Sequence, residues 1–373
     1  MTPTGGLRTS SIQKKGSTNS KKSRITIFFF DEIMAFKKIC VIHLNQIGDL
    51  VFSLPLLKAL RENYPSSTIH SIVRPHLKEL LVHSPYINHL LYRRKGIKDI
   101  LILLSEIRKN KYDLLITLSN SGECLFLTTF SGAKVKAGFS YFPWDFSLDI
   151  KEKVKGHLSW YYNLKLLERL KIDVQKRDYV GLLTLPAKED SKGLRESKIP
   201  DVQGKYVVIS PGTSARRRVK AWEEDKFGEL IILLKEKYNL NPILVGGEDN
   251  LEVNDKVIEM VRAKDKDKKV NPIENVAGKL GLKDLCYLLK DASLFVGVDS
   301  GIMHLASAFD IPVIGIFGPT DPFYVGPLNK KSLVVREEME CSPCYLKGCE
   351  DRTCMKKLEV KKVWDACQQL VHP

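Results

Sequence analysis

The sequence lacks several features that would assign it to a class at once. Among its 373 residues, no apolar run approaches the ~20 residues of a membrane span. The longest early run, Ile25–Phe30, is ended by Asp31 and Glu32 and is too short for a secretory signal. The chain also has no zinc-finger spacing, no RNP motif and no basic helix followed by heptads. These absences predict a cytoplasmic protein with no nucleic-acid partner.

The sequence has few acidic residues relative to basic ones. Lys and Arg number 59 against 44 Asp and Glu, a formal net charge of +15, whereas 43% hydrophobic residues are typical of a globular protein. The excess positive charge indicates an anionic membrane surface or a phosphorylated ligand as partner. The alternative is that the excess positive charge only keeps the protein soluble, and that part of it belongs to a basic tail.

Four segments are expected along the chain. The first is rich in Lys, Arg and Ser without helical periodicity, which predicts a disordered basic tail, and Met34 is then the natural start. A polar stretch at Leu185–Gly204 reads as a linker between two domains. The expected segments are a tail at 1–33, an N-terminal domain at 34–190, a second domain at 200–358 and a terminal helix at 359–373.

Strand and helix patterns alternate in both domains, which predicts α/β folds with parallel sheets. Short β-branched runs alternate with segments whose apolar residues recur at helical spacing. The expected strands are 37–43, 68–73, 89–92, 113–118, 134–137, 206–210, 242–245, 294–298 and 313–317. The expected helices are 50–63, 77–83, 98–109, 124–130, 158–170, 222–238, 251–261, 282–290, 302–309 and 360–371. Ligands of such sheets bind at the carboxyl ends of the strands, here in the cleft between the two domains.

The first candidate site is Asp49, where the first strand passes into a helix behind Gly48. Asp is a favoured helix N-cap, and that role is the first alternative. The functional alternative is a general base that projects into the cleft.

The second candidate site follows the first strand of the second domain. Thr213 and Ser214 lie in a Ser-Pro-Gly-Thr-Ser loop, and three arginines and Lys220 come directly after it. Small hydroxyl residues and exposed amides suit an anion, and the cations can neutralise a diphosphate. The loop is neither a Walker A motif nor a dinucleotide fingerprint.

The third candidate site joins a buried strand to a helix at Asp299, Ser300 and Gly301, with His304 one turn later. A helix N-terminus favours phosphate. Glu248, after another strand, is a candidate for hydrogen bonding to a ribose diol, with Glu252 as its alternative.

Taken together, these motifs resemble those of glycosyltransferase family 9, the ADP-heptose:lipopolysaccharide heptosyltransferases. Four blocks in the expected order carry the resemblance: Ile47-Gly48-Asp49 with Ser53-Leu54-Pro55, Ser210–Ser214 with Lys220-Ala221-Trp222, Asp299–His304, and Phe317–Pro322. The resemblance implies a GT-B fold of two Rossmann-like domains facing a central cleft, with the donor nucleotide bound mainly by the second and the acceptor by the first.

The resemblance further implies an inverting, metal-independent transfer of heptose from ADP-heptose to the lipopolysaccharide inner core, at the inner face of the inner membrane. By position Asp49 resembles the catalytic base, Lys220 the phosphate-binding lysine, and Thr213 and Ser214 the phosphate-contacting hydroxyls. The donor block corresponds to Asp299, Ser300, Gly301 and His304. The segment before Lys220 is longer than is usual in the family and carries Arg216–Arg218, so an arginine is the alternative to Lys220.

Other functions remain open on the sequence. A nucleotide-sugar epimerase or hydrolase, a transferase of another sugar and a non-catalytic nucleotide-sugar binder would share this architecture. Asp265-Lys266-Asp267 matches the D-x-D metal motif of another transferase fold, but no strand precedes it, which favours a solvated loop.

The cysteines fall into two groups. Cys40, Cys124, Cys286 and Cys367 lie in expected helices or strands and favour core packing. Four others fall within a short C-terminal segment, which allows a structural zinc site or free thiols. They are Cys341, Cys344, Cys349 and Cys354.

Overall fold

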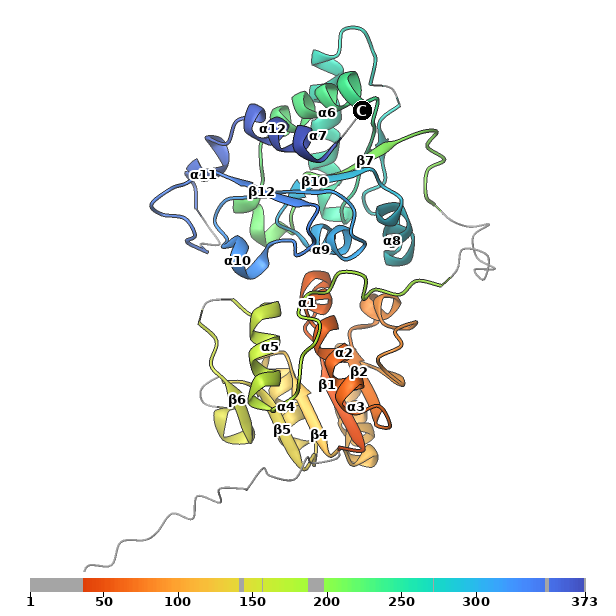
Figure 1. Ribbon diagram of the computed structural model, residues 1–373, viewed down its shortest axis with the longest axis vertical. Coiled ribbons are helices and arrows are strands. Elements are labelled where there is room, and N and C mark those ends of the chain that lie inside the picture. The colour runs from red at the N-terminus through yellow and green to blue at the C-terminus, as the bar shows by residue number, and fades with distance from the viewer. Residues whose placement is uncertain are drawn as a thin grey trace, which may run out of the picture. The chain divides into compact units, whose positions relative to one another are not determined.

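The computed structural model describes residues 36–140, 144–155, 157–186, 198–270, 272–345 and 349–371. The expected tail at 1–33 and the expected start at Met34 lie outside these residues. The chain from Phe36 onward forms one compact unit with two six-stranded sheets, which define an N-terminal and a C-terminal lobe (Figure 1).

The N-terminal lobe is a parallel sheet with the strand order β3-β2-β1-β4-β5-β6. Its strands are β1 (Lys38–Ile42), β2 (Thr68–Val73), β3 (His89–Tyr92), β4 (Leu114–Thr117), β5 (Val135–Phe139) and β6 (Ile150–Glu152). Its helices are α1 (Ile47–Phe52), α2 (Leu54–Asn63), α3 (Ile97–Asn110), α4 (Gly122–Phe130) and α5 (Trp160–Arg169), with 3₁₀ helices η1 (Pro75–Leu80) and η2 (Trp144–Ser147).

The C-terminal lobe repeats this plan with the order β12-β11-β10-β7-β8-β9. Its strands are β7 (Tyr206–Ser210), β8 (Asn241–Leu244), β9 (Glu274–Asn275), β10 (Leu294–Val298), β11 (Val313–Phe317) and β12 (Ser332–Arg336). Its helices are α6 (Glu224–Tyr238), α7 (Leu251–Lys264), α8 (Leu282–Lys290), α9 (Gly301–Ala308), α10 (Pro322–Val325), α11 (Thr353–Lys356) and α12 (Val360–Leu370), with 3₁₀ helices η4 (Ala215–Lys220) and η5 (Glu248–Asn250).

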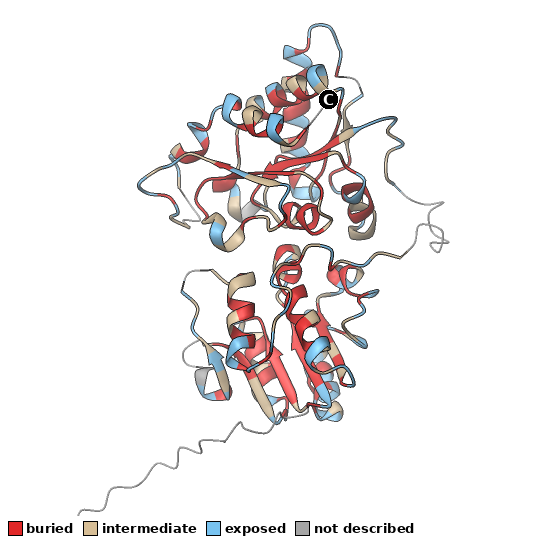
Figure 2. Ribbon diagram, viewed as in Figure 1, coloured by how far each residue is buried: buried red, intermediate tan, exposed pale blue. Residues whose placement is uncertain are grey.

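The central strands are buried on both faces, as their continuous apolar sequences predict. Every residue of β10 and β11 is buried, and the strands of both sheets lie beneath helices that expose only their outer faces (Figure 2). Burial of one such Ile or Leu side chain contributes about 1.5–3 kcal/mol. The hydrophobic effect therefore holds the sheets rigid, and the loops at their ends are placed precisely.

The described elements match the predicted ones closely, although the short elements η2, η4, η5, α10 and α11 were not predicted, and there are three further differences. The single helix expected at 50–63 is two helices, because the Ser53 hydroxyl donates to the Leu50 carbonyl (2.6 Å) and Pro55, the second residue of α2, has no amide hydrogen to donate. The helix expected at 77–83 is η1, and the short edge strands β6, β9 and β12 were not predicted. In the part of the predicted linker that is described, 185–186 and 198–204, no helix or strand forms.

The terminal helix α12 belongs to the C-terminal lobe, where it packs on α6, β11 and β12. Trp222 joins the same region, since its indole nitrogen donates to the Leu358 carbonyl at 2.9 Å. None of the helices in the described part of the chain has the length and apolar character of a membrane span.

Candidate active site

The predicted site residues follow strands of both sheets. Asp49 comes after β1, Thr213 to Lys220 after β7, Glu248 after β8 and the Asp299 block after β10. Because parallel strands end at the same edge of a sheet, each lobe presents its site residues at one edge.

Asp49 is the third residue of α1 and is partly buried. The N-cap of this helix is Gln46, and its side chain makes no capping hydrogen bond, so the alternative that Asp49 is the N-cap is wrong. Burial raises the pKa of Asp49 to about 6, against the opposing effects of Arg217 and Lys220, while Asp299 raises it further. The charges of the C-terminal lobe thus act directly on a carboxyl of the N-terminal lobe, and its pKa suits proton transfer near neutrality.

The two lobes meet where α1 lies against α9. A Cβ on Gly301 would stand 2.9 Å from the Cβ of Ile47 and 3.2 Å from the Gly48 nitrogen, and one on Gly48 would stand 2.8 Å from His304 Cδ2. Only glycine permits this approach of the two backbones. A second contact joins the lobes at η1, where the Lys283 amide donates to Glu79 at 2.6 Å.

His304 lies in this interface. It is 3% exposed, its ring stands edge-on to Phe52 at 4.5 Å between centroids, and Nδ1 is 3.1 Å from the Tyr179 hydroxyl. Burial lowers the pKa of His304 to about 4, although Asp299 acts in the opposite direction. A neutral, packed histidine supports α9 and the lobe interface; the donor-binding role stays a prediction.

Lys220 forms a buried ion pair with Asp299, and Thr320 donates to the same carboxylate oxygen at 2.7 Å. Burial alone would raise the pKa of Asp299, but Lys220 and Thr320 outweigh it and hold the pKa below its ordinary value. The charge of Lys220 is therefore already compensated within the protein.

The loop after β7 is organised around Thr213 and Arg217. The Thr213 hydroxyl donates to the Arg217 carbonyl at 2.9 Å, whereas Ser214 is exposed. At Arg217 the backbone leaves the helical conformation (φ −131°, ψ 29°) and interrupts η4. Arg217 makes no ion pair with a carboxylate of the described residues, and together with Lys220 and Thr320 it lines a small hollow.

Ser300 is the N-cap of α9, and its hydroxyl is buried without a hydrogen-bond partner among the described residues. A buried unpartnered hydroxyl beside the amides of a helix N-terminus suits an anionic ligand.

Glu248 is exposed at the end of β8, in η5. The neighbouring Asn250 was not predicted from the sequence. Its amide donates to the Thr213 carbonyl at 2.9 Å, and it fills the space that a Cβ on Gly212 or Gly246 would need. Asn250 thereby ties the loop after β7 to the loop after β8.

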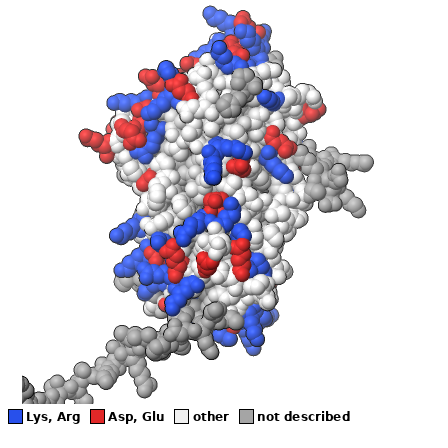
Figure 3. Space-filling view, viewed as in Figure 1, with Lys and Arg blue, Asp and Glu red and all other residues white. Residues whose placement is uncertain are grey.

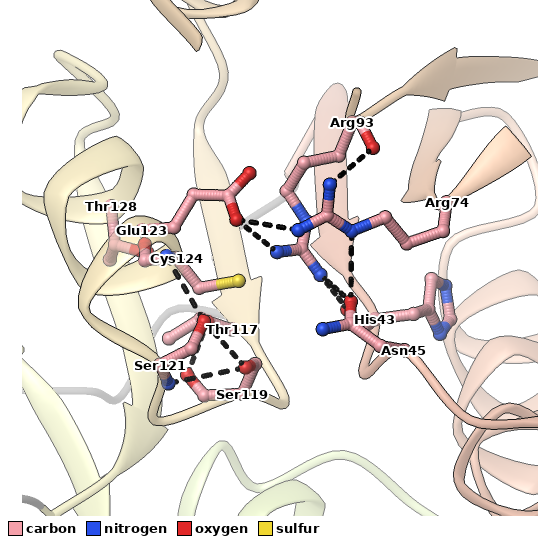
Figure 4. Close-up of polar contacts among 10 residues, drawn as sticks. All are labelled: His43, Asn45, Arg74, Arg93, Thr117, Ser119, Ser121, Glu123, Cys124 and Thr128. Atoms are coloured by element: carbon pink, nitrogen blue, oxygen red, sulfur yellow. Dashed lines mark hydrogen bonds and ion pairs between the residues drawn. The ribbon is translucent and has the colours of Figure 1, made fainter. Parts of the chain in front are cut away.

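A buried polar network supports the loop that leads to Asp49 (Figure 4). Arg93 is fully buried and donates to Glu123 at 3.0 Å, and Arg74 donates to the same oxygen at 2.7 Å. Both arginines also donate to the amide oxygen of Asn45. This network was not predicted from the sequence. The one indication of it was that each of the two arginines directly follows a strand, where site residues are expected.

Two further predictions concern metal binding. The Asp265 carboxylate accepts from the amides of Lys269 (3.1 Å) and Val270 (2.8 Å) and is buried. The prediction of a solvated loop is therefore wrong for Asp265, which stabilises the turn after α7, and correct for Asp267, which is exposed.

The structure does not assemble the cysteine site that the sequence allowed. All four cysteines are described and carry free thiols; Cys341 is exposed, Cys354 is buried, and Cys344 and Cys349 are intermediate. Within the described ranges, no group of three or more His, Cys, Asp or Glu side chains is placed to hold a metal ion. Burial raises the pKa of the Cys354 thiol, and Cys344 and Cys341 raise it further, so these three thiols are close enough to interact, and the zinc site stays a prediction.

Comparison with known proteins gives consistent results. The model of glycosyltransferase family 9 (heptosyltransferase) matches residues 100–354. Lipopolysaccharide heptosyltransferase 3 of Escherichia coli K12 is 30% identical, over 80% of this chain and 90% of the relative. Lipopolysaccharide core heptosyltransferase OpsX of Haemophilus influenzae is 25% identical, over 80% of this chain and 84% of its own.

Two solved structures share the fold. ADP-heptose lps heptosyltransferase II of E. coli has a TM-score of 0.72 at 20% identity and covers 89% of this chain and 98% of its own. A family 9 glycosyl transferase from Veillonella parvula DSM 2008 has a TM-score of 0.71 at 21% identity, and the match covers 90% of this chain and 97% of the other. With two parallel six-stranded sheets in the described residues, these likenesses confirm the predicted two-domain GT-B architecture.

Proposed function

Since the chain belongs to glycosyltransferase family 9, we propose that it transfers a heptose from ADP-heptose to the inner core of lipopolysaccharide. Relatives named as lipopolysaccharide heptosyltransferases support the reaction. One observation supports the site most directly: Arg217, Lys220 and Asp299 of the C-terminal lobe act electrostatically on the Asp49 carboxyl of the N-terminal lobe.

The proposed mechanism inverts the anomeric centre. Asp49 accepts the proton of the acceptor hydroxyl as its oxygen bonds to C1 of the heptose, and the bond from C1 to the diphosphate breaks on the opposite face. General base catalysis of this kind is worth roughly 10²–10⁴-fold. A carboxyl whose pKa is about 6 is ionised at pH 7 and still basic enough to take the proton.

The leaving diphosphate requires positive charge and hydrogen-bond donors. Lys220 is the residue whose position matches the family motif, but its charge is already neutralised by Asp299. We assign the uncompensated charge to Arg217, which lines the same hollow as Lys220 and Thr320. Ser300 and the first amides of α9 would donate to the phosphate oxygens.

The remaining predicted residues receive narrower roles. Thr213 holds the backbone of Arg217, exposed Ser214 remains available to a phosphate, and Glu248 would accept from the ribose hydroxyls. Because Arg217 would supply positive charge to the diphosphate, we propose that transfer is metal-independent. The acceptor would bind to the N-terminal lobe, from a position peripheral to the cytoplasmic face of the inner membrane.

The test is transfer itself. The protein is incubated with heptose-deficient lipopolysaccharide and a panel of nucleotide sugars, with and without a chelator, and the product is analysed by mass spectrometry. We expect a mass increase of one heptose with ADP-heptose only, unchanged by the chelator, and inversion at the anomeric carbon by NMR. Consumption of the donor at the same rate without acceptor would instead indicate an epimerase or hydrolase.

A further inference from the structure

A groove of about 650 Å³ opens between α5, the segment after β6 and α10. Lys153, Lys155, Lys165 and Arg169 line it on the N-terminal lobe together with Tyr161, and Tyr324 lines it from the C-terminal lobe. The proposed mechanism uses none of these residues. Figure 3 shows basic and acidic side chains gathered over α5 and β6 on the face in view.

The groove has more positive charge than its own carboxylates can neutralise. Glu168 lies 2.7 Å from Lys165, and Glu152 lies 2.7 Å from Arg169. Lys153 and Lys155 are exposed, and neither pairs with a carboxylate of the described residues. Two ammonium groups therefore remain for an anionic ligand, at a concave site where several contacts can be made together.

Aromatic rings from both lobes form the other wall. Tyr162 of α5 and Tyr324 of α10 stack in parallel, 5.9 Å between centroids at 5°. Tyr161 lies 5.9 Å from Phe323, which is 59% exposed. Tyr161 and Tyr324 are partly buried. Aromatic rings beside polar groups provide both apolar contact area and hydrogen bonds, which suits a sugar ring with its apolar face and its hydroxyls.

The groove adjoins the proposed active site through the helices that line it. The helix α5 packs on α1, which carries Asp49, and on α10. The helix α10 begins two residues after Thr320, whose hydroxyl donates to Asp299. A ligand in the groove would therefore touch elements next to both the proposed base and the proposed diphosphate site.

We propose that this groove binds a phosphorylated saccharide, namely a phosphorylated part of the acceptor at a distance from the hydroxyl that reacts. The inference rests on the proposed function for the identity of the acceptor. Lys153 and Lys155 bind the phosphate, and the rings of Tyr161 and Tyr324 contact the sugar. A flat membrane surface would engage the lysines without entering the groove, so it does not require the tyrosine wall.

The experiment compares two acceptors, heptose-deficient lipopolysaccharide as isolated and the same material after enzymatic dephosphorylation. The variants are the double substitution Lys153→Gln/Lys155→Gln and the single substitution Tyr324→Ala. The matched control is Lys98→Gln/Lys109→Gln, which removes the same charge from exposed positions on α3. Equal melting temperatures of the variants and the wild type establish that the fold is intact.

We expect the double lysine variant to raise the KM for phosphorylated acceptor about tenfold, equivalent to the ~1.4 kcal/mol of one charge-assisted contact. The KM for the donor and the KM for dephosphorylated acceptor should stay unchanged. Tyr324→Ala should raise the KM for both acceptors, and the control should change neither. Equal effects of the lysine variant on both acceptors, or no effect, would overturn the proposal.

Direct binding separates this proposal from the proposed function. Wild type and variants are titrated with both lipopolysaccharides without donor, and with vesicles of phosphatidylglycerol. A preference for phosphorylated lipopolysaccharide that the lysine variant loses supports the groove even if no heptose is transferred. Equal loss of binding to the vesicles would identify a membrane contact instead and contradict the saccharide site.

Discussion

A Cβ placed on Gly301 of the C-terminal lobe would lie 3.2 Å from the backbone nitrogen of Gly48 in the N-terminal lobe. The first turns of α1 and α9 therefore touch through two residues without side chains. Asp49 is the next residue after Gly48, so this contact fixes how far the proposed base stands from the proposed donor site. The same approach brings His304 under Gly48.

Substitution of Gly301 tests this contact. Gly301→Ala places a methyl group against the Ile47 Cβ and the Gly48 backbone, and a backbone cannot move aside as a side-chain end can. We expect a loss of stability of about 1–3 kcal/mol, and a fall in kcat of at least about tenfold because Asp49 is displaced. Unfolding curves and steady-state kinetics measure both, with Gly122→Ala, which meets no atom within 4 Å, as control. Unchanged kcat would show that the contact does not position the base.

Removal of the Asp49 carboxylate separates chemistry from donor binding. Asp49→Asn should retain the affinity for ADP-heptose and lose at least about 10² in kcat, the low end of what base catalysis provides. Because burial raises the pKa of Asp49 to about 6, its ionised form is unfavourable in the folded protein at pH 7. The variant should therefore also be more stable at pH 7, by at most about 3 kcal/mol. Near-normal turnover would reject Asp49 as the base.

The pH dependence of the reaction follows from the same carboxyl. A base works only when it is deprotonated, so kcat/KM should fall about tenfold per pH unit below its pKa, which burial raises to about 6. With an ordinary exposed Asp as the base, kcat/KM would not change as the pH falls to about 4. Initial rates between pH 5 and 8 at fixed ionic strength measure the profile. A flat profile down to pH 5 would contradict the assigned environment of Asp49.

The assignment of the diphosphate charge predicts unequal roles for neighbouring arginines. Arg217→Gln should weaken donor binding and lower kcat, together at least about tenfold in kcat/KM, because Arg217 forms no ion pair with a carboxylate of the described residues and its charge remains for the diphosphate. Arg218→Gln, an exposed position in the same helix, is the matched control and should change little. Calorimetric titration with ADP and steady-state kinetics give the two effects.

The outcome for Lys220 completes that comparison. Lys220→Ala should destabilise the fold as well as weaken donor binding, since it leaves the buried Asp299 carboxylate without its partner. A Lys220 variant with normal stability and a larger loss of donor affinity than Arg217→Gln would return the role to Lys220.

Two buried histidines predict how stability depends on pH. Burial lowers the pKa of His43 to about 3 and that of His304 to about 4. Below the ordinary value of 6.5, the unfolded chain binds protons that the folded protein does not. Stability should therefore be complete above pH 6.5 and fall as the pH drops toward 4, by at most about 1.4 kcal/mol per pH unit for each histidine.

Denaturant unfolding at pH 7 and pH 4.5 measures this loss. His304→Gln, which removes one titrating group and can still bond Tyr179, should lose less stability between the two pH values than the wild type. An equal loss in both proteins would show that His304 does not contribute to the acid sensitivity.

Local pattern was sufficient to predict most of the fold. The strands β7, β10 and β11 were predicted with their exact bounds, because a buried parallel strand is a short apolar run that ends at turn residues. The edge strands β9 and β12 escaped prediction, since β9 has two residues and β12 is only partly buried. The break at Ser53 depends on one hydroxyl that competes for a helix carbonyl, which periodicity does not register.

The sequence indicated residues of the candidate site but not the contacts that they make with residues far away in the chain. Motifs at strand ends pointed to Asp49 and Asp299, which stand beside glycine or serine where a helix begins. Lys220 was assigned by the family resemblance, and the roles of all three stay predictions. The motifs did not show that Lys220 and Asp299 neutralise each other, since 79 residues separate them. Nor did they show that Asn250 links two loops or that Tyr179 meets His304, 125 residues away.

The order and character of the helices and strands, the two-domain plan and the strand-end motifs were determined by the sequence alone, because burial and turn chemistry act over a few neighbouring residues. Which charges are compensated and which groove is lined by both lobes were decided only by tertiary structure. Electrostatic interaction and van der Waals contact depend on distance in space, and the fold sets that distance between residues far apart in the chain.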